Sequence, residues 1–437
     1  MAPVMSDVLD APYEAAVLEA LGEASTARLE EPNTARRMSW KYVAILGGLM
    51  ALGPLSMDMY LPALPAVGHD LHASQALTQI TLMAFILGMA IGQVVIGPLS
   101  DARGRKGPLL IGIAVYLVAS LLCAVAPSVW ILVALRFVQG FAGGAGVIAL
   151  AIARDLFDGV ALSRSVSLLM TVTFLGPIVA PVIGGQLLQF TSWHGVFVTQ
   201  AVCSAVALVA AALWLRETLE PGRRQSGDLA ATLGSFRQAL ANRNFLGYTL
   251  ASSLVFAGLM IYISAAPFAL ETIYHLSPEN FGLLFGVNAI GLAGANLVSG
   301  RLVGRVAPQR LMFGGMIVLA LASLVFLVDV ITGVGFVAVA PLLFVFVTSA
   351  GFILPNADAL GLSVSDPRIA GSASGVMGLI QLALGAVLAP LVGLAGTQTA
   401  TPMALSMVVG SLLGLLTYIA FFRRPTARGQ LKPRLNV

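Results

Sequence analysis

The sequence predicts an all-α integral membrane protein with twelve transmembrane helices in two pseudo-symmetric six-helix bundles. Three observations lead to this fold class. Of the 437 residues, 58% are hydrophobic and only 10% are Asp, Glu, Lys or Arg, whereas soluble proteins contain about 25% charged residues. Long charge-free stretches alternate with short charged breaks, and the second half of the chain repeats features of the first. This composition excludes a water-soluble enzyme and a disordered chain.

The charge-free stretches define the helices, because a helix needs roughly 20 apolar residues to cross a bilayer. Two stretches, 165–215 and 369–422, are too long for one crossing. Each contains a polar break, at 189–193 and 396–402, that divides it into a helical hairpin. The predicted helices cover residues 42–65, 76–99, 108–126, 129–153, 165–188, 193–215, 245–270, 280–300, 311–328, 333–357, 369–394 and 402–422.

The domain organisation follows from these helices. The first 38 residues contain seven acidic residues and lack the apolar segment of a signal peptide. We expect them to form a cytoplasmic tail, either mobile or with a short amphipathic helix. The predicted units are an N-terminal tail, an N-terminal bundle, a cytoplasmic central loop, a C-terminal bundle and a C-terminal tail, covering residues 1–40, 41–215, 216–244, 245–422 and 423–437.

The basic residues predict the orientation in the membrane. Of 24 Lys and Arg residues, 23 fall in the tails, the central loop or the loops on one face of the predicted helices, and the exception is Arg136. Basic residues accumulate on the cytoplasmic side of membrane proteins, so both termini are predicted to be cytoplasmic. The basic pI of about 9.3 is therefore explained by topology, and we expect no binding of nucleic acid.

An internal repeat divides the twelve helices into two sets of six. At an offset of 203 residues, five positions are identical: His72 and His275, Ser74 and Ser277, Gly88 and Gly291, Gly97 and Gly300, Leu99 and Leu302. Two homologous halves that face each other across a membrane are typical of a transporter.

The loop between the second and third predicted helices combines glycine with charges of both signs. We expect the glycines to permit tight helix ends and Asp101 to form ion pairs that stabilise one conformation. A loop that only marks the cytoplasmic face would explain its bases but not its acid or glycines. The related segment 300–305 lacks the acid. The candidate residues of this conformational-switch loop are Gly97, Asp101, Arg103, Gly104, Arg105 and Lys106.

The fifth predicted helix carries two prolines and three glycines in a short segment. Proline removes backbone hydrogen bonds and glycine permits close approach of helices, so we expect a bent, tightly packed helix. Generic packing by small residues is the alternative, as predicted for Gly282 and Gly286. The residues of this pattern are Gly176, Pro177, Pro181, Gly184 and Gly185.

Few ionisable residues fall inside the predicted spans, and a charge at mid-membrane costs about 2.5–3.5 kcal/mol on insertion scales. Asp58 and Arg136 lie at similar predicted depths. We hypothesise that both face one cavity and that protonation of Asp58 changes their electrostatic coupling, with Arg136 permanently charged. The alternative is a static ion pair that joins two helices. Asp329, Asp358 and Glu271 lie near span ends, where we expect interfacial positions.

Several of these segments resemble a known family. The loop 97–106 resembles the loop 2-3 signature of the major facilitator superfamily, and segment 176–185 resembles the helix 5 motif of its antiporters. Segment 55–65, Leu-Ser-Met-Asp-Met-Tyr-Leu-Pro-Ala-Leu-Pro, resembles the helix 1 signature of the bicyclomycin and chloramphenicol resistance (Bcr/CflA) branch of the drug:proton antiporters. Further likeness lies in segments 277–282, 351–356 and 370–375, and the resemblance covers about residues 40–422.

The resemblance implies the major facilitator fold and roles for individual residues. Arg105 would pair with Asp155 at the cytoplasmic end of the fourth helix. Asp101 would face the N-terminus of the eleventh helix, where the helix dipole favours an anion. The first, fourth, seventh and tenth helices would line a central cavity, in which each candidate side chain faces either substrate or lipid. The cavity candidates are Tyr60, Gln139, Tyr262, Phe268, Phe352 and Asn356.

The function implied is proton-coupled efflux of amphipathic drugs, such as bicyclomycin- or chloramphenicol-like compounds, across the bacterial inner membrane by alternating access. We expect a secondary active transporter and no enzyme, since the sequence has no His-Glu-x-x-His or Walker pattern. We expect no cofactor and no metal site, transport driven by the proton gradient, and a monomer whose partners are substrate, protons and lipid. The alternative is a same-fold exporter or importer of an amino acid, peptide or sugar.

Overall fold

A computed structural model describes residues 40–219, 222, 229–333, 335–366, 369–394, 396 and 399–422. Within these residues, twelve helical segments are long and apolar enough to cross a membrane. The predicted N-terminal tail, apart from Trp40, and the predicted C-terminal tail lie outside them. The all-helical, twelve-span fold class predicted from the sequence is confirmed.

The N-terminal bundle consists of the first six spans. Its helices are α2 (Trp40–Asp58), η1 (Leu61–Ala63), α3 (Leu64–Asp70), α4 (Gln75–Arg103), α5 (Lys106–Cys123), α6 (Val129–Gly143), η2 (Gly144–Gly146), α7 (Val147–Leu156), α8 (Gly159–Leu187) and α9 (Trp193–Trp214). Within this bundle α2 packs against α8 and α9, and α4 packs against α6.

The C-terminal bundle contains the other six spans and one shorter helix. Its helices are α10 (Leu229–Ala241), α11 (Arg243–Pro267), η4 (Phe268–Ile273), α12 (Pro278–Leu302), α13 (Pro308–Thr332), α14 (Phe336–Ser363), α15 (Ala370–Gly393) and α16 (Thr401–Phe422). Helix α10, which falls within the predicted central loop, was not predicted and packs against α11 and α15.

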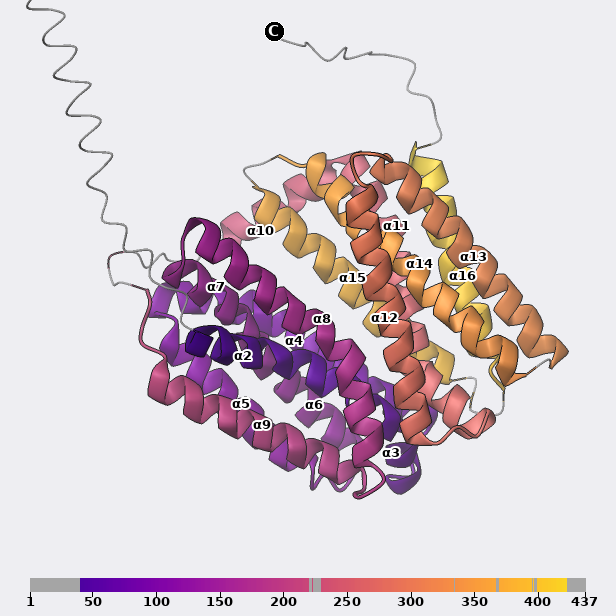
Figure 1. Ribbon diagram of the computed structural model, residues 1–437, viewed down its shortest axis with the longest axis horizontal. Coiled ribbons are helices and arrows are strands. Elements are labelled where there is room, and N and C mark those ends of the chain that lie inside the picture. The colour runs from indigo at the N-terminus through magenta and orange to yellow at the C-terminus, as the bar shows by residue number, and fades with distance from the viewer. Residues whose placement is uncertain are drawn as a thin grey trace, which may run out of the picture.

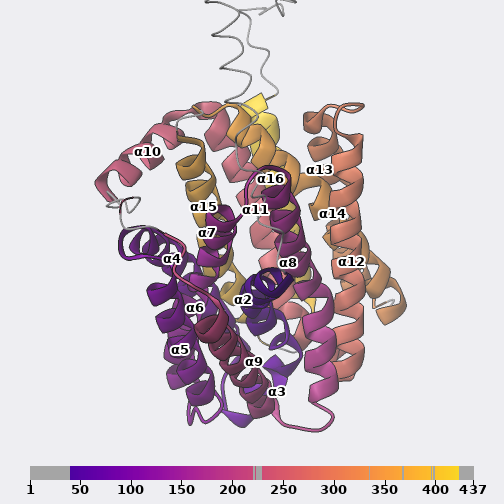
Figure 2. The same ribbon diagram turned by 60° about the vertical axis from the view of Figure 1, so that its left-hand side comes forward.

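The two bundles touch mainly at one end. Figure 1 shows the N-terminal helices in indigo to magenta and the C-terminal helices in pink to yellow, separated where α2 begins and α16 ends and meeting at the opposite end. We call these ends the termini side and the far side. The contacts between bundles are made chiefly by α8 with α12 and by α4 with α15, and Figure 2 shows the same arrangement after a turn.

Three spans predicted as continuous helices are broken. The first span breaks at Met59 and Tyr60 before the turn η1, because Pro62 lacks a backbone N–H and restricts the residue before it. The fourth span tightens into η2 at Gly144–Gly146, where glycine weakens the α-helix. The seventh span ends in the π-helical turn η4, which follows Pro267. In each case proline or glycine removes the support that a regular α-helix needs.

Helix α4 extends one turn beyond its predicted end, through Arg103. Gly104 ends it with φ of +97°, a conformation that favours glycine. The predicted role of Gly104 at a tight helix end is therefore confirmed, whereas the same prediction for Gly97 is wrong, because Gly97 lies inside α4.

The backbone also shows the internal repeat. Among the described residues, His72 and His275 are the only non-glycine residues with positive φ, at +48° and +55°. They are partners at the repeat offset of 203 residues. Each lies in the turn before the second membrane span of its bundle, which is α4 or α12. Because a side chain rarely adopts this conformation, the shared feature supports two related six-helix halves.

Candidate functional site

The two bundles enclose a cavity of about 550 Å³, a size that suits a drug-sized molecule. Helices α2, α4, α6, α7 and α8 form one wall and α11, α12 and α14 the other. The lining is mostly Leu, Met, Phe, Ile, Val, Pro and Gly. Its polar side chains are Asp58, Gln93, Thr173, Tyr262 and Asn288. Among the described residues that line this cavity on either wall, Asp58 is the only Asp, Glu, Lys, Arg or His.

Asp58 is the last residue of α2, at the point where the first span breaks. It lines the cavity and is 4% exposed. Its carboxyl group has no hydrogen bond or ion pair with any described residue. A carboxylate here receives no compensation from the protein for the hydration that it loses. The position therefore allows Asp58 to exchange a proton, or to pair with a cationic group, inside the cavity.

Arg136 lies behind the cavity wall, inside the N-terminal bundle, and is 0% exposed. Its Nη1 donates to Gln139 Oε1 at 2.7 Å and its Nη2 to the backbone carbonyl of Ser56 at 3.2 Å. The guanidinium carbon also lies over three aromatic rings, those of Phe85, Tyr60 and Phe197, at 4.3, 4.7 and 5.7 Å from their centroids. Among the described residues no carboxylate pairs with Arg136, and these contacts stabilise its charge, since cations are attracted to aromatic faces.

The hypothesis that Asp58 and Arg136 face one cavity is therefore met by Asp58 alone. Arg136 does not line the cavity, because its guanidinium is enclosed by the aromatic rings and the polar groups of its own bundle. The static ion pair is not formed either, since no N–O contact within 4.0 Å joins these two described residues. The two lie close in depth, because Arg136 binds the carbonyl of Ser56, two residues before Asp58.

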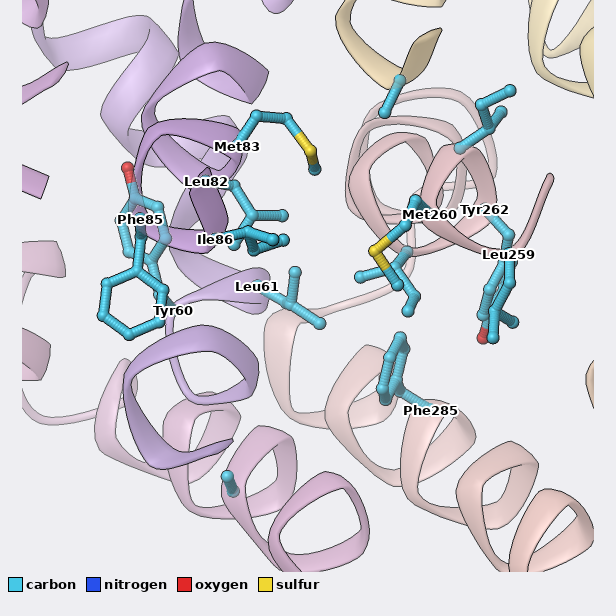
Figure 3. Close-up of a cluster of buried hydrophobic side chains, with 14 of the residues drawn as sticks. Tyr60, Leu61, Leu82, Met83, Phe85, Ile86, Leu259, Met260, Tyr262 and Phe285 are labelled. Atoms are coloured by element: carbon cyan, nitrogen blue, oxygen red, sulfur yellow. The ribbon is translucent and has the colours of Figure 1, made fainter. Parts of the chain in front are cut away.

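Tyr60 and Gln139, two of the predicted cavity residues, belong to this buried polar group and do not line the cavity. The Tyr60 hydroxyl bonds Thr81 Oγ1 at 2.9 Å. Gln139 Nε2 donates to Ser120 Oγ at 2.7 Å and to Gln200 Oε1 at 2.9 Å. Figure 3 shows Tyr60 beside Phe85, apart from the aromatic side chains of the other bundle. Their role is to enclose and orient Arg136.

Three other predicted cavity residues do not line the cavity, and all three lie in the C-terminal bundle. Phe268 is in η4 and lines a separate small pocket beside α15 and α16. Phe352 packs against Gly315 of α13. Asn356 Nδ2 donates to Ser299 Oγ at 2.6 Å and to the Phe352 carbonyl at 2.7 Å. The resemblance named the helices that line the centre, but helix packing decides which face of each helix points there.

Tyr262 is the predicted candidate that lines the cavity, and it does so next to a residue that the sequence did not single out. Its hydroxyl accepts a hydrogen bond from Asn288 Nδ2 at 2.8 Å. Its ring stacks on Phe285 with centroids 5.7 Å apart and planes 7° apart, and Figure 3 shows both rings in the C-terminal bundle. Asn288 was missed because α12 carries three asparagines, Asn280, Asn288 and Asn296, and residue type alone does not reveal which of them faces the cavity.

The glycines of the fifth span bring α8 against two different helices. A Cβ at Gly185 would lie 2.5 Å from the Pro278 carbonyl oxygen and 2.8 Å from Glu279 Cα of α12. A Cβ at Gly282 of α12 would overlap the Pro181 carbonyl of α8. The α8–α12 contact that closes the far side therefore requires glycine on both helices. Gly282, which the sequence suggested as a small packing residue, does pack closely, and its partner is the proline-glycine segment of α8.

The remaining residues of this segment pack within the N-terminal bundle. Gly176 faces the Pro54 ring of α2, and Gly184 faces the carbonyl of Met59 at the break of the first span. Pro177 lines the cavity. The segment thus joins the cavity wall to the far-side contact.

A second contact closes the far side between α4 and α15. A Cβ at Gly393 would lie 2.6 Å from the backbone of Ala76. Nearby, Gln79 Nε2 donates to the Ser264 carbonyl of α11 at 3.1 Å. Far-side closure therefore depends on close backbone approach, supported by a hydrogen bond between the bundles.

The conformational-switch loop contains the ion pair that the resemblance implied. Arg105 Nε contacts Asp155 Oδ2 at 3.1 Å, and Arg105 also pairs with Asp101 and donates to Ser100 Oγ. Arg103 is exposed. The Asp101 side chain is 48% exposed, and among the described residues no hydrogen bond or ion pair joins it to the N-terminus of α15, so that contact stays a prediction.

Glu217 is a member of this loop network that sequence reasoning missed. Its carboxylate accepts backbone N–H bonds from Arg105 at 2.8 Å and Lys106 at 3.1 Å, at the start of α5, and from the two residues that follow it. Lys106 Nζ donates to the Ala212 carbonyl near the end of α9. Partial burial raises the pKa of Glu217, but these N–H bonds outweigh it and hold the pKa below its usual value.

Of the three acids predicted near the interface, Asp329 is buried. It is 5% exposed in α13, and neither carboxyl oxygen has a partner among the described residues. Asp358 Oδ1 accepts from Gln381 Nε2 at 3.1 Å. Glu271, in η4, is partly exposed. None of the three lines the cavity.

Residues 46–390 match the sequence pattern of the Major Facilitator Superfamily. A Bacillus subtilis protein described as "Uncharacterized MFS-type transporter YdgK" is 36% identical over 393 residues, 89% of this chain and 97% of the relative. A Haemophilus influenzae protein described as "Bicyclomycin resistance protein homolog" is 33% identical over 387 residues, 88% of this chain and 96% of the relative. The resemblance seen in the sequence is thereby confirmed.

Solved structures show the same fold at low sequence identity. A mutant of the nucleoside transporter NupG superposes with a TM-score of 0.74 at 16% identity, over 88% of this chain and 100% of that chain. The xylose transporter XylE from E. coli superposes with a TM-score of 0.66 at 12% identity, over 90% and 98%. These likenesses concern the arrangement of helices alone.

Proposed function

Because the chain belongs to the Major Facilitator Superfamily, we propose that it is a secondary active transporter that exports amphipathic drugs in exchange for protons. The observation that carries the proposal is the apolar cavity between the bundles with the lone carboxyl group of Asp58 on its wall. A relative of similar length is described as a bicyclomycin resistance protein homolog, which supports bicyclomycin- or chloramphenicol-like compounds as substrates.

The cavity supports an amphipathic substrate of loose shape requirements. Its volume of about 550 Å³ admits a drug-sized molecule. Methionine and phenylalanine side chains, such as Met50, Met89 and Phe256, supply adaptable apolar contacts. Surfaces of this kind accommodate several ligands, because apolar contacts do not fix one orientation.

The position of Asp58 supports coupling to protons. When the cavity is empty, a proton is the natural neutraliser of a carboxylate that has no protein partner. A substrate that fills the cavity, or pairs with Asp58, competes with that proton. Arg136 stays charged and is bound to the carbonyl of Ser56 inside the N-terminal bundle, so the exchangeable proton is assigned to Asp58.

In alternating access, the two bundles separate at the end where they touch and come together at the opposite end. In this conformation the far side is closed by the α8–α12 and α4–α15 contacts. The reverse state would bring Asp101 toward α15 and separate the glycine contacts. We propose that the termini side faces the cytoplasm of a bacterial cell, since the described loops on that side carry basic residues such as Arg105, Arg305 and Arg310.

The test is expression in an efflux-deficient bacterium with a panel of compounds, together with proton flux in inverted membrane vesicles. We expect resistance to chloramphenicol- or bicyclomycin-like compounds, and release of protons from acidified vesicles when substrate is added. Vesicles with Asp58→Asn should show neither proton release nor concentrative transport. Saturable uptake of one amino acid, peptide or sugar, without resistance to any drug, would replace this proposal with a metabolite transporter.

A further inference from the structure

The cavity wall formed by the C-terminal bundle contains an amide group with an unused hydrogen-bond acceptor. Asn288 is 1% exposed and lines the cavity. Its Nδ2 donates to the Tyr262 hydroxyl at 2.8 Å, but its Oδ1 has no partner among the described residues. A buried acceptor without a partner is costly, so its retention at a cavity wall calls for an explanation.

The location separates Asn288 from the other unpartnered groups. Buried polar side-chain atoms without a partner also occur elsewhere in the described chain, for example in Gln79, Gln200 and Asp329. Among all of them, only the Oδ1 of Asn288 belongs to a residue that lines the central cavity. Asn356 also donates through its Nδ2, to Ser299, but it lies away from the cavity.

Tyr262 completes this group. Its hydroxyl oxygen accepts from Asn288, and its hydroxyl hydrogen has no acceptor among the described residues. The ring is held by stacking on Phe285, as Figure 3 shows. Asn288 and Tyr262 therefore offer one acceptor and one donor, and the terminal torsion of Asn288 is soft enough to turn its Oδ1 into the cavity.

We infer that Asn288 and Tyr262 form a polar subsite that selects substrates carrying an amide or a hydroxyl group. Such a group supplies a donor for Asn288 Oδ1 and an acceptor for the Tyr262 hydroxyl, while the apolar part of the substrate contacts Phe285, Leu259 and Leu292. This inference rests on the proposed function and adds a preference to it. The N-terminal wall presents a charge at Asp58, and the C-terminal wall presents neutral hydrogen-bonding groups.

The test compares two probes on purified protein in lipid nanodiscs, with binding measured by calorimetry. Chloramphenicol carries an amide and hydroxyl groups, whereas the tetraphenylphosphonium cation has no hydrogen-bonding group. Asn288→Leu keeps a similar volume and removes both hydrogen-bonding atoms. We expect the ratio of chloramphenicol affinity to tetraphenylphosphonium affinity to fall about tenfold. Tyr262→Phe, which keeps the stacked ring, should lower the same ratio by about threefold.

Asn296→Leu is the matched control, because Asn296 lies on the same helix and does not line the cavity. It should leave both affinities unchanged. Equal weakening of both probes by Asn288→Leu would show a structural role and overturn the subsite, as would an unchanged ratio. Wild-type protein that binds neither probe would instead contradict the proposed drug-export function, so the two failures are distinguishable.

Discussion

The N-terminal and C-terminal bundles share one helical plan but differ in the polar groups that they bury. The N-terminal bundle holds Arg136 among aromatic rings and presents Asp58 to the cavity. In the C-terminal bundle, α14 has no basic residue and α11 has no acidic residue. Its buried polar contacts include neutral amide and hydroxyl pairs, such as Asn288 with Tyr262, and its buried carboxyl group, that of Asp329, lies away from the cavity. Among the described residues, the cavity therefore has a carboxyl group on its N-terminal wall, at Asp58, and neutral hydrogen-bonding groups on its C-terminal wall, at Asn288 and Tyr262.

The largest effect should follow from removing the buried cation. Arg136→Ala leaves a large cavity. It also removes the hydrogen-bond donors to Gln139 Oε1 and to the Ser56 carbonyl oxygen. We expect the free energy of unfolding to fall by about 3–5 kcal/mol. In the other bundle, Asn356→Ala removes neutral hydrogen bonds and should cost about 1–2 kcal/mol. Unfolding in mixed micelles measures both, and equal losses would contradict the asymmetry.

The next effect concerns coupling. Asp58→Asn should abolish substrate-driven proton release and remove the effect of protonation on substrate affinity, which is about 5- to 150-fold for typical coupling between two ligands. Substrate binding should persist, because the cavity keeps its apolar lining. Asp358→Asn is the matched change in the C-terminal bundle, where the carboxylate is bonded to Gln381 and does not line the cavity. Loss of proton coupling in Asp358→Asn but not in Asp58→Asn would reverse the comparison of the bundles.

A smaller effect tests the contact that joins the two bundles. Gly185→Ala and Gly282→Ala each place a Cβ against backbone of the opposite bundle. Each should destabilise the far-side contact by about 1–2 kcal/mol and shift the population toward far-side-open states. Distances between spin labels on the far ends of the bundles measure this shift. Gly294→Ala is the control on α12, because the added Cβ would have no atom within 4 Å. This change should leave the spin-label distances as in the wild type.

The smallest effect concerns the termini-side loop. The lowered pKa of Glu217 means that its carboxylate stabilises the fold at neutral pH, and that this stabilisation is lost as pH falls through the lowered pKa. Glu217→Gln should cost less than about 1 kcal/mol at pH 7, because the group is mostly exposed. The difference from wild type should vanish in acid. A difference that persists below the pKa would show that the charge of Glu217 is not responsible.

The sequence predicted the conformational-switch loop, residues 97–106, more accurately than the cavity. The resemblance of the loop 97–106 to a family signature implied the pairing of Arg105 with Asp155, and that pair is present. The cavity candidates Tyr60 and Gln139 lie instead around Arg136. Aromatic and amide residues occur on every face of a buried helix, so their type does not reveal the direction in which they point.

By itself, the sequence determined the twelve spans, the two related halves and the few charges worth following, because hydration makes each charge inside a membrane costly and therefore rare. Only the tertiary structure decided that Asp58 faces the cavity while Arg136 lies behind its wall. It also placed Gly185 against α12 and Asn288 at the cavity. The reason is physical: side-chain direction and close helix contacts arise from packing between segments far apart in the chain, which local pattern does not encode.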